Sequence, residues 1–136
     1  AAGSHFTRAA YQASGMELSN VSMRALAALE REPGLRIGEL AAREGIRQPS
    51  MSQAMKRLVN DGYAARHTAD DDARATALTI TDAGREVLRS YRVAAAEAVA
   101  PVFEPLKPED VATLKRAAEL LPELTAELKQ RKGGRE

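Results

Sequence analysis

One stretch, residues 45–62, constrains the fold of this chain more than any other. It begins at Gly45 and ends at Asp61-Gly62, a pair that commonly ends a helix. Between these ends the apolar residues recur at helical spacing on one face, namely Met51, Ala54, Met55, Leu58 and Val59. The opposite face carries Pro49, Gln53, Lys56 and Asn60, flanked by Ser50, Ser52 and Arg57. Polar and basic side chains without acids suit phosphates and base edges, although an ordinary surface helix explains this helix alone equally well.

The residues before this helix favour a helix-turn-helix. Residues 37–46 have the pattern of a short helix that ends in a tight turn. Ala41 is small, Gly45 follows four residues later, and Met51 follows ten residues later. In a helix-turn-helix the small residue lets two helices cross closely, the glycine forms the corner, and the third residue packs the second helix onto the first. We therefore predict a recognition helix over residues 48–60.

Composition narrows the classes of function. The chain has 136 residues, no cysteine and two histidines, so we expect one domain without disulfides, a cofactor or a metal site. No apolar run approaches the roughly 18 residues of a membrane span, so we expect a cytoplasmic protein that does not contact membranes. No nucleophile–base pair or phosphate loop can be assembled, so an enzyme is not predicted. The acids at Asp70–Asp72 are better explained as a solvated turn than as a magnesium site.

Charge is distributed unevenly along the chain, although the net charge is only +1. Residues 46–68 contain four Lys or Arg and one acid, whereas residues 97–128 contain three Lys or Arg and seven acids. This asymmetry indicates that one end of the molecule faces a polyanion and the other does not.

The rest of the first half supplies further elements. Residues 1–5 contain Gly-Ser-His, the usual remnant of a cleaved tag, and we set them aside. We predict a weak helix over residues 6–14, then a helix capped by Ser19 that stops at Glu32-Pro33-Gly34. Residues 35–37 are expected to pair as a short strand.

A β-hairpin is predicted after the recognition helix, since residues 63–68 and the alternating residues 74–80 enclose an acidic turn. A hairpin in this place is a wing, whose tip reaches a minor groove through Arg74. Alternatively, Arg74 forms a salt bridge with one of the acids at 70–72 and only stiffens the loop; both roles can coexist.

Two more helices follow the hairpin. Thr81 is expected to cap a long helix whose apolar side includes Ala83, Val87 and Leu88, and Pro101 and Pro105 end it near Glu104. A last helix starts at Pro108 and precedes a frayed polar tail over residues 129–136.

The helices outside residues 19–80 are too apolar for one small domain to cover. We expect a second copy of the chain to cover them across a two-fold axis, the alternative being a monomer in which they fold back. The predicted fold class is therefore mainly α with a small β-hairpin wing. A winged helix-turn-helix over residues 19–83 is flanked by dimerisation helices over residues 6–18 and 84–136.

Residues 18–90 resemble the MarR family of bacterial and archaeal regulators. The resemblance rests on LSNVSMRALAAL at 18–29, GELA at 38–41, IRQPSMSQAMKRL at 46–58, DGY at 61–63, DAR at 72–74 and LTITDAG at 78–84. It implies a winged-helix homodimer that binds a pseudo-palindromic operator in double-stranded DNA. It also implies dimerisation through the terminal helices. Many relatives release DNA when a small, often phenolic, anion binds between the two regions.

The resemblance also assigns residues. Pro49, Ser50, Ser52, Gln53 and Lys56 occupy the family's groove-facing positions, and Asp72 and Arg74 its wing motif. The candidate DNA contacts are Arg47, Gln48, Pro49, Ser50, Ser52, Gln53, Lys56, Arg57, Asp72 and Arg74.

The chain also departs from the family pattern. Arg47 replaces a frequent capping Ser, so the cap either shifts to Gln48 or is lost. Gln53 replaces a frequent Arg, which favours adenine over guanine. Lys56 replaces a common Asp and Ala73 a common Arg, so an ion pair between wing and helix and one wing cation are in question. The N-terminal helix is shorter than usual.

Two functions follow from these residues. The first is a sequence-specific transcription regulator, usually a repressor. The second is a protein-interaction module that kept the winged helix and lost DNA binding. The ligand-binding residues are unknown, since Tyr11, Arg24, His67 and Tyr91 suit a pocket, the core or the surface equally.

Overall fold

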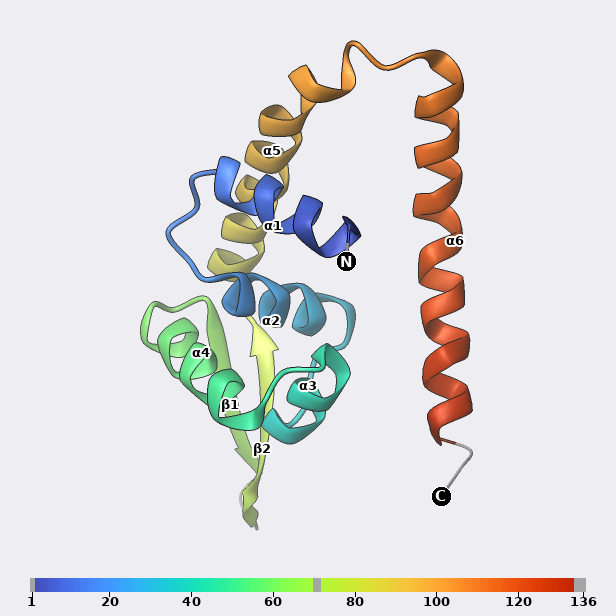
Figure 1. Ribbon diagram of the computed structural model, residues 1–136. Coiled ribbons are helices and arrows are strands. Elements are labelled where there is room, and N and C mark those ends of the chain that lie inside the picture. Colours follow the sequence, from blue (N-terminus) through green and yellow to red (C-terminus); the bar gives the residue numbers. More distant parts are fainter. Residues whose placement is uncertain (1, 70–71, 134–136) are drawn as a thin grey trace. The chain divides into compact units, whose positions relative to one another are not determined.

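A computed structural model describes the backbone of residues 2–69 and 72–133 and the side chains of residues 2–68 and 76–131 (Figure 1). The elements in order are α1 (Ala2–Ala13), α2 (Asn20–Arg31), α3 (Ile37–Glu44), α4 (Gln48–Asn60), β1 (Ala64–Ala69), β2 (Asp72–Ile80), α5 (Asp82–Phe103) and α6 (Pro108–Gly133). This order confirms a mainly helical fold with a two-stranded antiparallel hairpin. The chain forms two compact units, residues 1–98 and 99–136, and the winged helix lies wholly within the first.

Helix α2 begins and ends at the predicted residues. The hydroxyl of Ser19 accepts a hydrogen bond from the backbone N–H of Ser22 at 3.1 Å, which satisfies one of the free donors of the first turn. The helix ends at Arg31, just before Pro33 and Gly34, and Gly34 has a positive φ of 90°. The predicted cap and helix stop are both confirmed.

The core of the first unit is built from the predicted apolar faces. Side chains of α2, α3, α4 and the hairpin meet there, joined by the first turns of α5. The largest fully buried apolar side chains are Leu26, Leu29, Leu40, Met51, Met55, Leu58, Leu78 and Leu88. This core holds α4 by one face only, so its other face is turned outward.

The hairpin pairs in a regular register from Ala64 opposite Ile80 to Thr68 opposite Thr76. The register shifts between Thr68 and Ala69, the last described residue pair being Ala69 opposite Asp72. A third pairing joins Leu35 to Leu78, since the Leu78 N–H donates to the Leu35 carbonyl at 2.9 Å. The predicted short strand before α3 is thus confirmed as a single bridge.

Helix α5 starts against the end of the recognition helix. The Thr81 hydroxyl donates to the Gly62 carbonyl at 2.6 Å and accepts from the Gly84 N–H at 3.1 Å. The backbone N–H of Thr81 donates to the Tyr63 carbonyl at 3.1 Å. Thr81 therefore caps α5, as predicted, and also anchors it. The predicted apolar side was wrong at Ala83, because Ala83 is exposed and Gly84 is buried in its place.

The terminal helices extend further than predicted. Helix α1 starts at Ala2, so residues 2–5, which were set aside as a tag remnant, continue the helix. Helix α6 continues to Gly133, although a frayed tail was expected from residue 129. Within the first unit α1 contacts α5 through Tyr11 and Tyr91, whose ring centroids lie 5.8 Å apart at an angle of 54°.

Candidate nucleic-acid interface

The corner between α3 and α4 has the geometry that the spacing predicts. Gly45 adopts a left-handed conformation with φ of 61°, which costs glycine little. The N–H of Ile46 donates to the Ala41 carbonyl at 3.0 Å and closes the turn. Ala41 and Met51 are buried, as close packing of the two helices requires. The helix-turn-helix is therefore formed by local residues that were identifiable in advance.

The first turn of α4 has no side-chain cap. Arg47 is the N-cap residue and makes no capping hydrogen bond, so the cap is lost and not shifted. Pro49 lacks an N–H, and the first turn contains no acid. The remaining free N–H groups and the positive end of the helix dipole favour an anion over a cation at this end.

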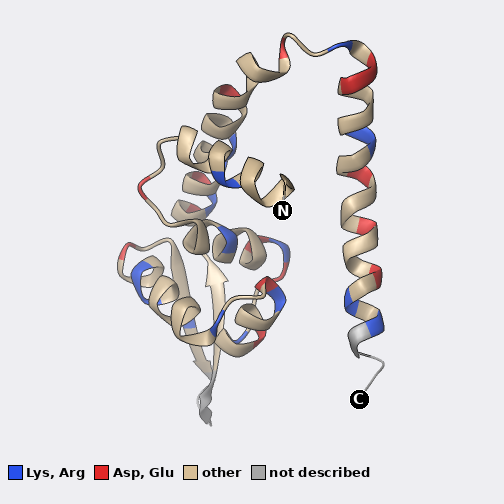
Figure 2. Ribbon diagram, in the orientation of Figure 1, with Lys and Arg blue, Asp and Glu red and all other residues tan. Residues whose placement is uncertain are grey.

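The outer face of α4 is uncovered over its whole length within the described part of the chain. Its predicted contact residues are exposed except for Ser52, which is half-buried. The exposed set is Arg47, Gln48, Pro49, Ser50, Gln53, Lys56 and Arg57, with Asn60. Figure 2 shows the charges, and no acid lies on α4 itself. A helix surface of this size and charge is available to a polyanion.

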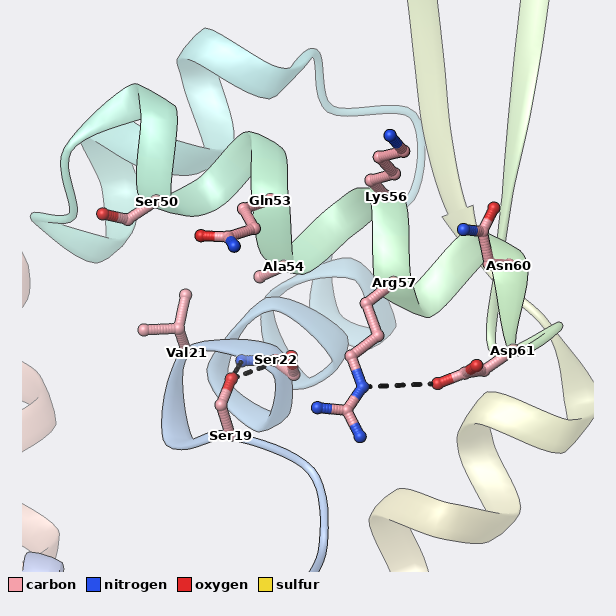
Figure 3. A pocket seen from close by; sticks show the side chains of 10 residues that line it. All are labelled: Ser19, Val21, Ser22, Ser50, Gln53, Ala54, Lys56, Arg57, Asn60 and Asp61. Carbon is pink, nitrogen blue, oxygen red and sulfur yellow. Dashed lines mark hydrogen bonds and ion pairs between the residues drawn. The ribbon is translucent and has the colours of Figure 1, made fainter.

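A cleft of about 540 Å³ runs along one side of α4, between this helix and the start of α2 (Figure 3). Ser50, Gln53 and Lys56 lie along its α4 wall, whereas Ser19 and Val21 form the α2 wall. Ser22, Ala54, Arg57, Asn60 and Asp61 complete the lining. The cleft therefore places the start of α2 beside the outer face of α4.

Arg57 differs from the other predicted contacts on α4. Its guanidinium extends along the cleft toward Asp61, with Nε 3.6 Å from the carboxylate (Figure 3). Both side chains are about half exposed, so the pair is weak and solvent-screened. Arg57 is thus shared between the face and its own helix end.

A second cleft of about 360 Å³ lies on the other side of α4, between α3 and the hairpin. It is lined by Arg36, Ile37, Ser52, Arg66, Thr76 and Leu78. Sequence reasoning missed Arg36 and Arg66 as site residues. The alternation of the strands could have identified Arg66. Arg66 is paired with Leu78, which is buried, and paired residues lie on the same face of a hairpin, so Arg66 lies on the face turned toward the helices.

The cations of the winged helix whose side chains are described fall into two groups. Arg24, Arg31, Arg43 and Arg57 each form an ion pair, with Glu44, Glu44, Glu32 and Asp61 respectively. Arg36, Arg47, Lys56 and Arg66 form no ion pair with any acid among the described residues. All four lie on α4, at its N-cap or in the cleft beside it. Among the described cations of the winged helix, those without an ion pair therefore lie around the recognition helix.

The wing residues are placed only in part. Asp72 and Arg74 belong to strand β2, but their side chains lie outside the described residues. The same holds for a salt bridge from Arg74 to the acids at 70–72. The roles of Asp72 and Arg74 therefore stay predictions.

The four residues considered for a ligand pocket have other contacts. Tyr11 packs on Tyr91, Arg24 pairs with Glu44 at 3.2 Å, and the His67 ring is hydrogen-bonded to the Thr79 hydroxyl at 2.8 Å. Burial, and to a lesser extent the neighbouring Tyr91, raise the pKa of Tyr11 above its ordinary value of 10.0, while Arg57 opposes the rise. None of the four lines either cleft beside α4.

The described residues hold neither a metal-binding cluster nor a membrane-spanning helix. No group of three or more His, Asp or Glu side chains is arranged to hold a metal ion there. No helix there is both long and apolar enough to cross a membrane.

Comparisons with known proteins agree with this geometry. A sequence profile of the MarR family matches residues 14–75. An uncharacterised HTH-type transcriptional regulator of Mycobacterium leprae is 31% identical over 114 residues, which cover 84% of this chain and 78% of the relative.

Solved structures give the same result. A MarR family transcriptional regulator from Silicibacter pomeroyi is 30% identical, with a TM-score of 0.56, over 85% of this chain and 77% of its own. The PcaV transcriptional regulator of Streptomyces coelicolor, solved with its natural ligand, shares the fold at 22% identity and a TM-score of 0.65, over 89% of each chain.

Proposed function

The chain belongs to the MarR family of helix-turn-helix transcriptional regulators, and on that premise we propose that it is a homodimeric repressor that binds a specific sequence in double-stranded DNA. The single observation that carries the proposal is the outer face of α4. It is exposed, it contains no acid, and the described cations of the winged helix that form no ion pair lie on it or beside it. A protein-binding surface does not need cations gathered around a face without acids, whereas a DNA-binding surface does.

Within this proposal the contacts divide into two kinds. Gln53 and Ser50 meet base edges in the major groove, and an amide such as that of Gln53 pairs with adenine. Arg47, Gln48, Lys56 and Arg57 contact phosphates around the groove, and Pro49 and Ser52 fit the helix against it. Asp72 and Arg74 take the family's wing roles, with Arg74 in the minor groove.

The proposed dimer follows from apolar side chains that one subunit leaves exposed. The large apolar side chains found exposed in the described part of the chain are Phe6, Val93, Val102, Leu114, Leu121, Leu124 and Leu128. They belong to α1, α5 and α6. A second copy covers such a surface across a two-fold axis, and it places two recognition helices about 34 Å apart on a pseudo-palindromic operator.

The proposal is tested by measuring binding to a duplex from the gene's own upstream region and to a shuffled duplex of equal length. We expect a clear preference for the upstream duplex, an affinity that falls steeply with salt, and a dimer in light scattering. Equal binding of both duplexes at moderate salt, or a monomer at micromolar concentration, contradicts the proposal.

Two substitutions test the assigned roles. Gln53→Ala is expected to relax the base preference at one position in each half-site, a loss of about 1–3 kcal/mol of discrimination. Arg74→Ala is expected to weaken binding to all sequences alike. The reverse pattern rejects the assignment of these two residues.

We include in the proposal that a small aromatic or anionic ligand releases the protein from DNA, as it does in many members of the family. PcaV is a relative in fold that was solved with its natural ligand. A thermal-shift screen with aromatic carboxylates tests it here. A compound that raises the melting temperature and lowers DNA affinity supports it.

A protein-interaction module without DNA binding is the competing function. Its support is the net charge of only +1 and the alanine at position 73. It predicts no retention on a DNA column and a protein that co-purifies with the chain.

A further inference from the structure

The cleft between α3, α4 and the hairpin has a feature that the proposed contacts do not use. Two arginines from different elements, Arg36 at the start of α3 and Arg66 on β1, line it together. Both side chains are exposed, and neither pairs with an acid among the described residues. Two like charges in one cleft repel each other, so an anion between them is stabilising.

Glu39, the acid nearest to Arg36 in the sequence, does not neutralise that arginine. Glu39, three residues after Arg36, accepts a hydrogen bond from the Arg36 backbone N–H at 2.8 Å through its Oε2 atom. Its carboxylate caps α3. It forms no ion pair with the Arg36 guanidinium. Among the described residues, no acid forms an ion pair with either arginine of the cleft.

The rest of the lining suits a phosphodiester. Ser52 of α4 is half-buried and offers a hydroxyl, while Ile37 and the buried Leu78 form an apolar floor. An apolar floor lowers the local dielectric and strengthens each charged hydrogen bond above it. Guanidinium groups bind phosphate oxygens in a bidentate manner that a single lysine does not reproduce.

DNA geometry determines which group reaches this cleft. A major groove and the neighbouring minor groove are separated by one sugar–phosphate strand. If α4 lies in the first groove and the wing reaches the second, that strand passes between α4 and the hairpin. The cleft lined by Arg36, Ser52 and Arg66 lies between these two elements.

We propose that Arg36 and Arg66, with the hydroxyl of Ser52, bind the phosphate strand that crosses from the major groove at α4 to the minor groove at the wing. This inference rests on the proposed function and adds a second anchoring point to it. The contacts carry no base information, so they contribute affinity and register for every sequence alike.

The test compares Arg36→Gln, Arg66→Gln and Ser52→Ala with a matched control, Arg31→Gln. Arg31 is an exposed arginine of the same winged helix that pairs with Glu44, so its substitution changes the net charge equally. Affinity for the upstream and the shuffled duplex is measured between about 50 and 200 mM salt. Circular dichroism and light scattering verify that each variant is folded and keeps the oligomeric state of the wild type.

Each arginine variant is expected to lower the slope of log K against log salt by about 0.9 per lost contact, hence by roughly 2 in a dimer. The ratio of the two affinities stays at its wild-type value. Ser52→Ala weakens binding without a change of slope, because it removes no charge. Arg31→Gln leaves both slope and affinity near the wild-type values.

Two outcomes overturn the inference alone. The first is wild-type slopes in both arginine variants while the wild-type protein still prefers the upstream duplex. The second is protection by inorganic phosphate, seen as a thermal shift that both arginine variants lose, with unchanged DNA slopes; the cleft is then a site for a free anion. If the wild-type protein shows no preference for the upstream duplex, the proposed function fails first and this inference fails with it.

Discussion

The winged helix and the terminal helices of this chain are incomplete in different ways. The winged helix buries its large apolar side chains itself, since almost all of the core residues lie between Leu18 and Ile80. The terminal helices do the opposite, because each large apolar side chain found exposed among the described residues lies in α1, α5 or α6. One region forms its own core, and the other leaves apolar surface without a cover.

The two regions also differ in charge. On the winged helix the described cations without an ion pair lie around α4, whereas residues 97–128 contain seven acids and three Lys or Arg. The winged helix carries described cations without an ion pair, and the terminal helices carry the exposed large apolar side chains. The cations are met by a polyanion and the apolar side chains by another apolar surface, so one chain carries requirements for two different partners.

The largest expected effect comes from comparing a buried leucine with an exposed one. Leu58→Ala in α4 removes a fully buried side chain and should lower the free energy of unfolding by about 2–5 kcal/mol at any protein concentration. Leu128→Ala in α6, where the side chain is 68% exposed, should act only by weakening the dimer. Urea unfolding at several protein concentrations measures both.

The comparison between the two regions breaks down if the two leucines behave alike. A loss below about 1 kcal/mol for Leu58→Ala means that the core of the winged helix is not formed by one chain. A loss for Leu128→Ala that is independent of concentration means that α6 packs on its own subunit.

The second prediction concerns the junction of the two regions, at Gly84. A Cβ atom there would collide with the Tyr63 carbonyl oxygen and lie 2.8 Å from Cγ1 of Ile80. Gly84→Ala should therefore force α5 away from the end of the recognition helix and destabilise the protein by about 1–3 kcal/mol. Thermal unfolding measures the loss.

Gly38→Ala is the control for Gly84→Ala. Gly38 lies in α3, and a Cβ atom there meets only Gln48 Oε1, at an ordinary distance of 3.8 Å. We expect this variant to be as stable as the wild type or slightly more stable, because alanine favours a helix. Equal losses in the two variants would show that α5 is not tightly seated on Tyr63.

Sequence reasoning succeeded where the signal was local. The corner at Gly45, the cap at Ser19 and the apolar face of α4 depend on residues within one or two turns of each other, and all were predicted. It failed where distant elements meet. Arg36 and Arg66 are 30 positions apart, and only the folded hairpin brings them to one cleft.

The error at Ala83 has the same origin as the missed arginines. Helical spacing alone accepts Ala83 or Gly84 on the buried side of α5. The close approach of Tyr63, which comes from a different element, decides in favour of the glycine. The dimer surface was inferred from an excess of apolar residues, but its partner surface is a property of the assembly and not of one sequence.

The third prediction compares helix starts in the two regions. Ser19→Ala removes the cap of α2 and should cost about 1 kcal/mol, because the Ser22 N–H loses its acceptor. Ser4→Ala in α1 removes a hydroxyl that makes no hydrogen bond with a described residue, so its effect should lie within about 0.5 kcal/mol of zero. Equal effects, measured by urea unfolding, would mean that α2 is held by packing alone.

The smallest effect on stability is expected from substituting Tyr11, whose ring packs on Tyr91 and joins α1 to α5. Burial raises the pKa of Tyr11 in the folded protein above 10.0, its value in the unfolded chain. Well below pH 10 the phenol is protonated in both states, so stability does not depend on its titration. As the pH rises through 10 toward the folded-state pKa, the unfolded chain loses the proton first and unfolding becomes more favourable.

Tyr11→Phe should therefore flatten the alkaline end of the stability curve while leaving the difference between variant and wild type constant from pH 7 to about pH 9. Urea unfolding at a series of pH values measures the stability of the two proteins, and the near-ultraviolet absorbance of the phenolate follows the ionisation of the tyrosines. An alkaline fall as steep in the variant as in the wild type would mean that the Tyr11 ring is solvated and that α1 is not held against α5. The short N-terminal helix would then depend for its position on the second copy of the chain, as we propose for the exposed leucines of α6.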